Sequence, residues 1–240
     1  ALRWAETEGK IVTGKGTVIT SVPLLVRNNM SVYAPNLNII ADACNGWLIG
    51  DDNQSFVGSF VVGDVTRKDF YDGNGAIPGT FAYLNSGIVL QAVVGQSIYF
   101  GDIKGFANAL DFNPLGLHDG SSAAKGSAGE NRLYGKTIQR NAAGIRMRHT
   151  GTGTATVNVN ARGWLEGNTI NVSIFGCDIG IKQELDALAT YTQLHGVIDC
   201  AQGKEGQSSV TSIDIDSEIE NGIIADLYFL RHGKFNLTNA

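Results

Sequence analysis

The sequence is short of cysteine and proline and has no surplus of positive charge, and each shortage excludes a class of protein. The three cysteines, Cys44, Cys177 and Cys200, are too few and too scattered for a disulfide framework. They form no CxxC pair and no Cys/His spacing of the kind that binds zinc, so we expect free thiols in a core. The four prolines do not make a low-complexity linker. The formal net charge is −5, so the chain lacks the surplus of positive charge with which proteins bind the phosphates of nucleic acids.

Long apolar runs and helical periodicity are missing as well. No apolar run approaches the roughly 18 residues that span a bilayer, so membrane insertion is not expected. Residues 183–189 carry the best helical pattern, which predicts a short helix or a loop excursion. The motifs of phosphate loops, nucleophile elbows, zinc proteases and dinucleotide-binding folds do not occur in their required contexts. The sequence predicts no cofactor and no metal site.

Glycine is abundant instead, with 31 residues in a chain of 240, close to twice the ordinary usage of about 7%. Glycine spread through β-rich sequence predicts many tight turns. Residues 97–100, 155–160, 169–174 and 210–215 alternate polar and apolar side chains or are rich in β-formers, as strands are. The length suits a single domain over residues 1–240.

A degenerate repeat organises these strands. An apolar residue is followed by a polar, turn-rich stretch and then by a small residue and a closing apolar residue. The copies run from Ile40 to Trp47, Phe81 to Ile88, Ile103 to Leu110, Ile138 to Ile145 and Ile174 to Ile181, with an imperfect sixth from Asp216 to Ile223. Asparagine recurs inside them, as Asn45, Asn85, Asn108, Asn141 and Asn221. Each copy is explained by a strand that ends, a tight turn, and a new strand that begins with an inward apolar residue.

The repeat therefore predicts an all-β fold, a right-handed parallel β-helix with loop excursions from the turns. We assign residues 1–14 to an N-terminal cap and residues 15–240 to the coils. A β-sandwich is the alternative, and it explains the strands but not the recurring spacing.

Residues 15–47 resemble the first coils of phage tailspike and pectate-lyase-like β-helix proteins. Residues 15–24 have the order glycine, strand, proline and apolar residue, residues 28–33 are similar to the next turn and strand, and residues 2–5 are similar to the end of a capping helix. The resemblance implies a virion tail or extracellular protein that recognises host cell-surface polysaccharide, forms a homotrimer and contacts other virion tail proteins. Tailspikes have more coils and a C-terminal trimerisation module, so we expect a fragment or a short member. No aspartate cluster matches the pectate-lyase calcium site.

Three carboxylates, Asp214, Asp216 and Glu218, are the candidate catalytic residues. If Ile213 and Ile215 point inward, the three acids share the outer face. Adjacent members then lie about 6.7 Å apart along the strand, within the ~6.5–9.5 Å of inverting glycosidases. The alternative is a solvated strand edge whose charge deters edge pairing.

Candidate substrate-binding residues are Arg146 and Arg148, which flank Met147 and are expected to share one face. Two guanidinium groups so placed can bind the carboxylate of a uronate or a sialate. The alternatives are a solvated basic face, or pairing between coils or subunits with the acidic residues 214–220.

Aromatic residues add two more candidates, Trp164 and Tyr71, which can stack on sugar rings. Tyr71 lies in the turn-rich residues 68–79, and loops on a rigid scaffold often carry binding function. Trp47 occupies an inward repeat position and is expected in the core. Three functions remain open from the sequence: a tailspike or tail-fibre protein that recognises polysaccharide, an active polysaccharide depolymerase (hydrolase or lyase), and a structural virion component. Whether the chain is an enzyme is left open.

Overall fold

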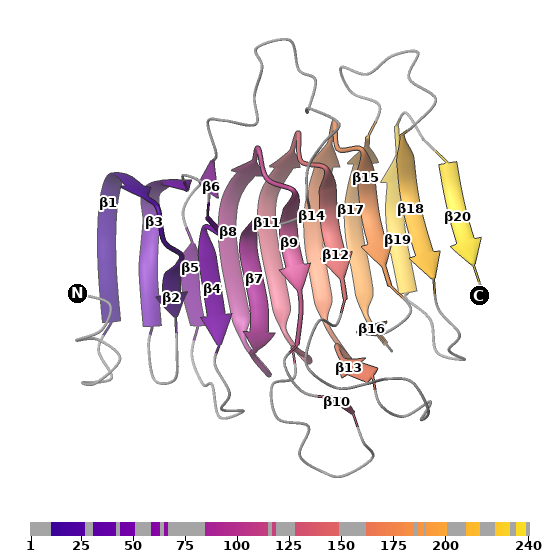
Figure 1. Ribbon diagram of the computed structural model, residues 1–240, viewed down its shortest axis with the longest axis horizontal. Helices are drawn as coiled ribbons and strands as arrows, with labels where there is room; N and C mark the ends of the chain where they lie inside the picture. The colour runs from indigo at the N-terminus through magenta and orange to yellow at the C-terminus, as the bar shows by residue number, and fades with distance from the viewer. Residues whose placement is uncertain are drawn as a thin grey trace.

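Figure 1 shows the computed structural model of the chain, in which the strands follow one another along the long axis of the molecule. It describes residues 11–26, 31–41, 44–50, 59–62, 65–66, 85–114, 117–118, 128–148, 162–184, 187–189, 191–200, 210–216, 224–230 and 234–238. All regular structure in these residues is β-strand. The described part contains no helix long and apolar enough to cross a membrane.

Two large sheets contain most of the strands. The first sheet consists of β1 (Ile11–Thr20), β3 (Ser31–Ala41), β5 (Ser59–Val62), β6 (Val65–Thr66), β8 (Ser97–Lys104), β11 (Arg132–Gln139), β14 (Thr169–Phe175), β17 (Gln193–Asp199) and β19 (Ile224–Phe229). The second consists of β2 (Leu24–Val26), β4 (Trp47–Gly50), β7 (Ser86–Ala92), β9 (Asn108–Phe112), β12 (Ala143–Met147), β15 (Ile179–Gln183), β18 (Thr211–Asp216) and β20 (Lys234–Thr238). A small third sheet contains β10 (Leu117–His118), β13 (Arg162–Trp164) and β16 (Ala187–Leu188).

The topology is that of a parallel β-helix. Every strand pairing described in the two large sheets is parallel, and strands along most of the chain alternate between these sheets. In the third sheet β13 pairs with β16 in parallel and with β10 antiparallel. Stacked parallel strands exclude the β-sandwich, because its sheets are built from antiparallel neighbours. The first strand begins at Ile11, ahead of the expected start of the coils, and residues 1–10 lie outside the described part.

The repeat corresponds to one corner of the solenoid. Its opening residues Ile103, Ile138 and Ile174 lie near the ends of strands in the first sheet and are buried. Its closing residues Leu110, Ile145 and Ile181 lie in the second sheet, are buried, and pair with one another across β9, β12 and β15. The predicted sequence of strand, turn and inward apolar residue is confirmed in these coils.

Glycine at the small position of the repeat is explained by close approach of successive coils. A Cβ atom at Gly144 would lie 2.6 Å from the carbonyl oxygen of Gly180, and one at Gly180 would lie 2.5 Å from that of Ser212. A methyl group does not fit at such distances, because they are far inside the usual 3.5–4.0 Å contact. Gly87 is enclosed in the same way, with Ala109 as its neighbour.

Asparagine side chains satisfy the backbone at the turns. The Asn141 Oδ1 atom accepts the Phe106 backbone N–H at 2.8 Å, and its Nδ2 donates to Ile103 and Gln139 carbonyl oxygens at 3.2 and 3.0 Å. Asn45 accepts the Ser86 backbone N–H at 2.6 Å. Buried backbone groups need such partners, since an unmade hydrogen bond is costly there.

A second asparagine ladder was not expected from the sequence. The Asn131 side chain accepts the backbone N–H of Gln96 at 3.1 Å, and that of Asn168 accepts the backbone N–H of Asn131 at 3.1 Å. Both side chains are buried. They stand just before β11 and β14, so the other corner of the solenoid is also fixed by side-chain amides.

Two points of local structure differ from the sequence pattern: the helical alternative for residues 183–189 and the position of the sixth repeat. No helix occurs over the described part of residues 183–189, because β15 runs to Gln183 and β16 covers Ala187–Leu188. The sixth repeat does not close at Ile223, because Ile213 is the residue that pairs with Ile181. Asp216 therefore ends β18 instead of opening a turn copy, and residues 217–223 lie outside the described part.

The core contains the closing residues of the first five copies, as expected: Trp47, Ile88, Leu110, Ile145 and Ile181. The opening residue Ile40 is half-buried, and its neighbour Ile39 lies in the core instead. The three cysteines are buried and none is in a disulfide, also as expected. Of the other asparagines of the repeat, Asn85 directly precedes β7 and Asn108 is the first residue of β9. Asn221 lies outside the described part.

Candidate functional site

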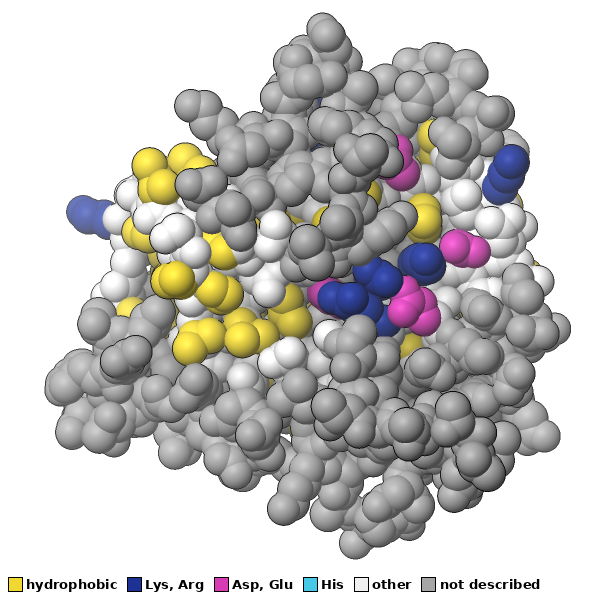
Figure 2. Space-filling model, viewed as in Figure 1, with side chains coloured by type: hydrophobic (Ala, Val, Ile, Leu, Met, Phe, Trp, Pro, Cys, Tyr) yellow, Lys and Arg dark blue, Asp and Glu magenta, His cyan; other side chains and the backbone are white. Residues whose placement is uncertain are grey.

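Four charged residues form a row across the outer face of the second sheet. Asp111, Arg146, Lys182 and Asp214 are direct neighbours in register on β9, β12, β15 and β18, and we call them the charged row. Each directly follows an inward apolar residue of its strand, so alternation turns it outward. Figure 2 shows acidic and basic side chains gathered on this face, to the right of an apolar region.

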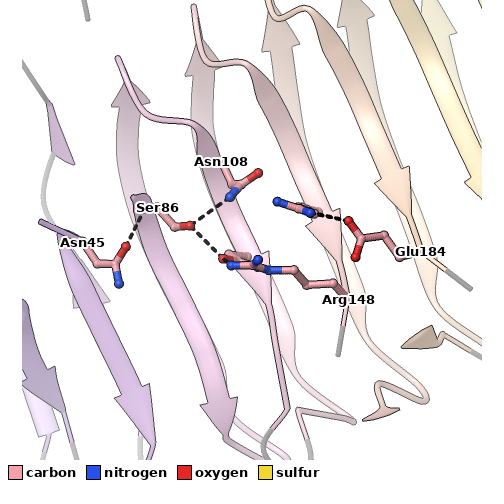
Figure 3. Close-up of polar contacts among 7 residues, drawn as sticks. Asn45, Ser86, Asn108, Arg148 and Glu184 are labelled. Atoms are coloured by element: carbon pink, nitrogen blue, oxygen red, sulfur yellow. Dashed lines mark hydrogen bonds and ion pairs between the residues drawn. The ribbon is translucent and has the colours of Figure 1, made fainter. Parts of the chain in front are cut away.

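Asp111, the first member of the charged row, forms a buried ion pair with Arg148. Arg148 donates from Nε to Asp111 Oδ1 at 2.9 Å and from Nη2 to Asp111 Oδ2 at 2.7 Å. The Ser86 hydroxyl donates to Asp111 Oδ2 at 2.7 Å, and Asn108 Nδ2 donates to the Ser86 hydroxyl at 3.1 Å (Figure 3). Asp111 is only 1% exposed. The carboxylate is thus held by three hydrogen bonds from two neighbouring coils.

The charge of Arg148 is secured by this pair. Burial of the guanidinium lowers the pKa of Arg148, but the hydrogen bonds and the negative charge of Asp111, together with the charge of Glu184, outweigh burial. The pKa of Arg148 therefore lies above its ordinary value. The side chain is a permanent cation whose two described hydrogen bonds both go to Asp111.

Arg146, the second member of the charged row, is paired with Glu184. Its Nε atom donates to Glu184 Oε1 at 2.8 Å, and its Nη2 atom contacts the same oxygen. Glu184 directly follows β15, so this pair also joins neighbouring coils. The Glu184 side chain keeps part of its surface in solvent, and the pair lies at the edge of the buried network.

The structure places the two predicted arginines as expected. Ile145 and Met147 are buried, so Arg146 and Arg148 share the outer face of β12. Both are paired between coils, with Asp111 and Glu184 as the described partners. Their role in binding sugar stays a prediction.

The structure describes the side chain of only one of the three candidate carboxylates, Asp214. Asp214 lies in β18, is half-buried and stands beside Lys182 in the charged row. Asp216 ends β18, but its side chain lies outside the described part, and so does all of Glu218. Asp214 and the arginines, proposed from separate stretches of sequence, thus lie on one face.

The aromatic candidates lie beyond what the structure describes in detail. Trp164 ends β13 in the third sheet, and only its backbone is described. Tyr71 lies outside the described residues altogether. Their roles in stacking on sugar stay predictions.

Sequence reasoning missed Asp111, Lys182 and Glu184. Asp111 and Lys182 carry a readable signal, because each follows the closing apolar residue of a repeat directly, as Arg146 does. Alignment of the coils on that residue gives Asp111, Arg146 and Lys182 without a structure, but not Asp214, because the last copy of the repeat pointed to Ile223. Glu184 carries no such signal, since it lies beyond the end of β15.

Within the residues that the structure describes, no group of three or more His, Cys, Asp or Glu side chains is placed to hold a metal ion. Comparison with known proteins finds no family model, no curated protein and no solved structure that matches the chain.

Proposed function

We propose that this protein is a tailspike-type recognition module that binds a charged cell-surface polysaccharide along the outer face of its second sheet. The observation that carries the proposal is the charged row, in which successive coils each supply one charged side chain. Neighbouring strands of a sheet lie about 4.8 Å apart, so the row offers closely spaced polar contacts along the solenoid axis. An extended polymer that lies along this axis meets several of them at once.

The charged residues have different parts in this proposal. Arg148 is bound on two nitrogens by Asp111, which makes it a rigid support for the face. Lys182 and Asp214, which are half-buried, then make the contacts with the ligand, and Arg146, which is only 9% exposed and paired with Glu184, is reached at its edge. Cationic side chains bind the carboxylates of acidic sugars, and a carboxylate accepts hydrogen bonds from sugar hydroxyls. Side chains already fixed by ion pairs lose less conformational entropy on binding.

Depolymerisation is a second candidate, favoured by one further juxtaposition. Lys182 is opposite Asp214, so Glu184 lies on the neighbouring coil and two residues further along. If the strand geometry of β15 continues to Glu184, the Cα atoms of Asp214 and Glu184 lie about 8 Å apart, and side chains that project in parallel keep their carboxyl groups at a similar separation. Carboxyl separations of about 6.5–9.5 Å are typical of inverting glycosidases. Glu184 thus joins Asp216 and Glu218 as a possible second carboxylate for Asp214.

The resemblance of residues 15–47 extends the proposal to assembly and location. We propose a homotrimer on a virion tail, outside the cell and in contact with other tail proteins. Sedimentation equilibrium of the purified chain tests the trimer. A purely monomeric protein at the highest attainable concentration contradicts it.

Binding to a panel of bacterial capsular and lipopolysaccharide glycans tests the function. We expect one or more acidic glycans to bind, and Lys182→Ala to weaken that binding by about tenfold, as loss of a charge-assisted contact does. Lys104→Ala is the matched control, because Lys104 is an exposed lysine on the first sheet. Equal binding by both variants contradicts the proposed surface.

The same samples test turnover through release of reducing ends or of ultraviolet-absorbing lyase products. If either appears, Asp214→Asn and Glu184→Gln are expected to abolish it while binding persists. Release that survives both substitutions rejects these two residues as the catalytic pair.

A further inference from the structure

The outer face of β14 consists of three short polar side chains. Thr169, Asn171 and Ser173 alternate with buried apolar residues of the strand, and Asn171 is exposed. The neighbouring strands carry larger side chains beside it. Tyr134 on β11 and His195 on β17 both stand in register with Asn171. We call this arrangement the β14 trough, with residues 169, 171 and 173 as its floor and Tyr134 and His195 as its walls.

The width of the trough suits one ring. Its walls are two strand spacings apart, about 9.6 Å, so a ring over Asn171 lies about 4.8 Å from each wall. Tyr134 already holds a ring at a similar spacing on its other side. There the Tyr99 ring on β8 is stacked on it, with centroids 5.2 Å apart and an interplanar angle of 16°. A ring in the trough would extend this stack by one member.

Side chains of the trough are exposed to solvent, Asn171 and Tyr134 among them. Tyr134 is 38% exposed although Tyr99 covers one of its faces. Asp226, which lies in register with His195 on β19, is exposed and has its carboxylate 3.7 Å from His195 Nδ1. A ligand in the trough therefore reaches an aromatic face, an amide and hydroxyls, while Asp226 contacts His195 from the side away from the trough.

We propose that the β14 trough binds one pyranose ring of a glycan. The C–H face of a sugar packs against the free face of Tyr134, which offers a large apolar surface with a polar tip. The sugar hydroxyls then pair with the Asn171 amide and the floor hydroxyls. A purely apolar ring fits less well, because it would cover these polar groups without pairing them. The site lies on the first sheet, so it does not depend on the charged row of the second.

Saturation-transfer NMR tests the trough with four probes: methyl α-glucopyranoside, methyl α-mannopyranoside, methyl β-galactopyranoside and methyl N-acetyl-β-glucosaminide. We expect transfer to at least one of them, strongest for the ring protons that face the tyrosine. Tyr134→Ala is expected to weaken binding by about tenfold, through loss of the aromatic contact.

Asn171→Tyr is the sharper variant, because it puts a ring into the trough while keeping the fold. The new tyrosine extends the existing stack, so the melting temperature is expected to stay at or above that of the wild type, and glycoside binding is expected to disappear. Lys15→Ala is the control, because Lys15 is an exposed lysine on β1, several strands away from the trough, and it is expected to leave glycoside binding unchanged. Absence of transfer from all four probes overturns the proposal, and so does equal transfer to the wild type and to Asn171→Tyr. Neither result bears on polysaccharide binding by the charged row.

Discussion

Replacement of Arg148 by alanine tests whether the pair with Asp111 joins the coils of the second sheet. The Asp111 carboxylate is 1% exposed and would keep only the Ser86 hydroxyl among its described donors. Removal of one partner of a buried ion pair costs about 3–5 kcal/mol, because the other charge is left uncompensated. For a protein of this length each 1 kcal/mol corresponds to about 2–4 °C. We therefore expect the melting temperature to fall by about 6–20 °C.

The converse change is expected to cost less. In Asp111→Ala the cation is not trapped, because the Arg148 side chain is already 16% exposed and its long stem lets the head reach water. We expect a loss of about 1–3 kcal/mol from the unpaired groups that remain. The double variant Asp111→Leu with Arg148→Met removes both charges and is expected within about 1 kcal/mol of the wild type.

Thermal and urea denaturation followed by circular dichroism provide the measurement. Lys136→Ala is the control, because its ion pair with Asp102 at 3.2 Å has a lysine side chain that is 71% exposed, and such pairs contribute less than about 1 kcal/mol. The raised pKa of Arg148 means that its contribution is fully present below the ordinary arginine pKa and is lost only under more alkaline conditions. The order of the melting temperatures of these variants is thus expected to be the same at every pH near neutrality. The reasoning is refuted if Arg148→Ala has the same melting temperature as Lys136→Ala, or if Asp111→Ala has the lowest melting temperature of the variants.

Two further substitutions test the corners of the solenoid. Gly180→Ala puts a methyl group 2.5 Å from the Ser212 carbonyl oxygen and is expected to cost about 1–3 kcal/mol; the same change at Gly14, where the nearest atom is 3.7 Å away, serves as control in urea denaturation. Asn168→Ala leaves the buried backbone N–H of Asn131 without its acceptor and is expected to cost about 1–3 kcal/mol. Asn36 is exposed, so Asn36→Ala is its control in thermal denaturation. Equal melting temperatures of the two asparagine variants would contradict a stabilising role of the ladder.

The sequence predicts the solenoid because the corner imposes a chemical requirement at each turn of the chain. The small residue of the repeat is needed where a Cβ atom would meet the backbone of the next coil, as at Gly144. The closing residue must be apolar because it points into the core, as Ile145 and Ile181 do. These requirements act within a few residues, so a single sequence reveals them.

The polar contacts are harder to predict because their partners are distant in sequence. Asp111 and Arg148 are 37 residues apart, and Arg146 and Glu184 are 38 apart. Coils of unequal length hide such neighbours, since no fixed spacing aligns them. The same inequality explains the error in the last coil, where the seven-residue motif pointed to Ile223 and the pairing selects Ile213.

The burial of charge beneath this face favours recognition over stability as the reason for the charged row. A face selected only for stability has no need of a carboxylate as buried as Asp111, because apolar residues of similar size stabilise a protein equally well or better. A face selected only for solubility would expose its charges, whereas the Arg148 side chain is largely covered. Fixed charges in a row do serve a ligand that must be held in one orientation, since their geometry is set before binding. Under the proposed function, the pair of Asp111 and Arg148 is the support that holds the face on which Lys182 and Asp214 meet an extended, charged polymer.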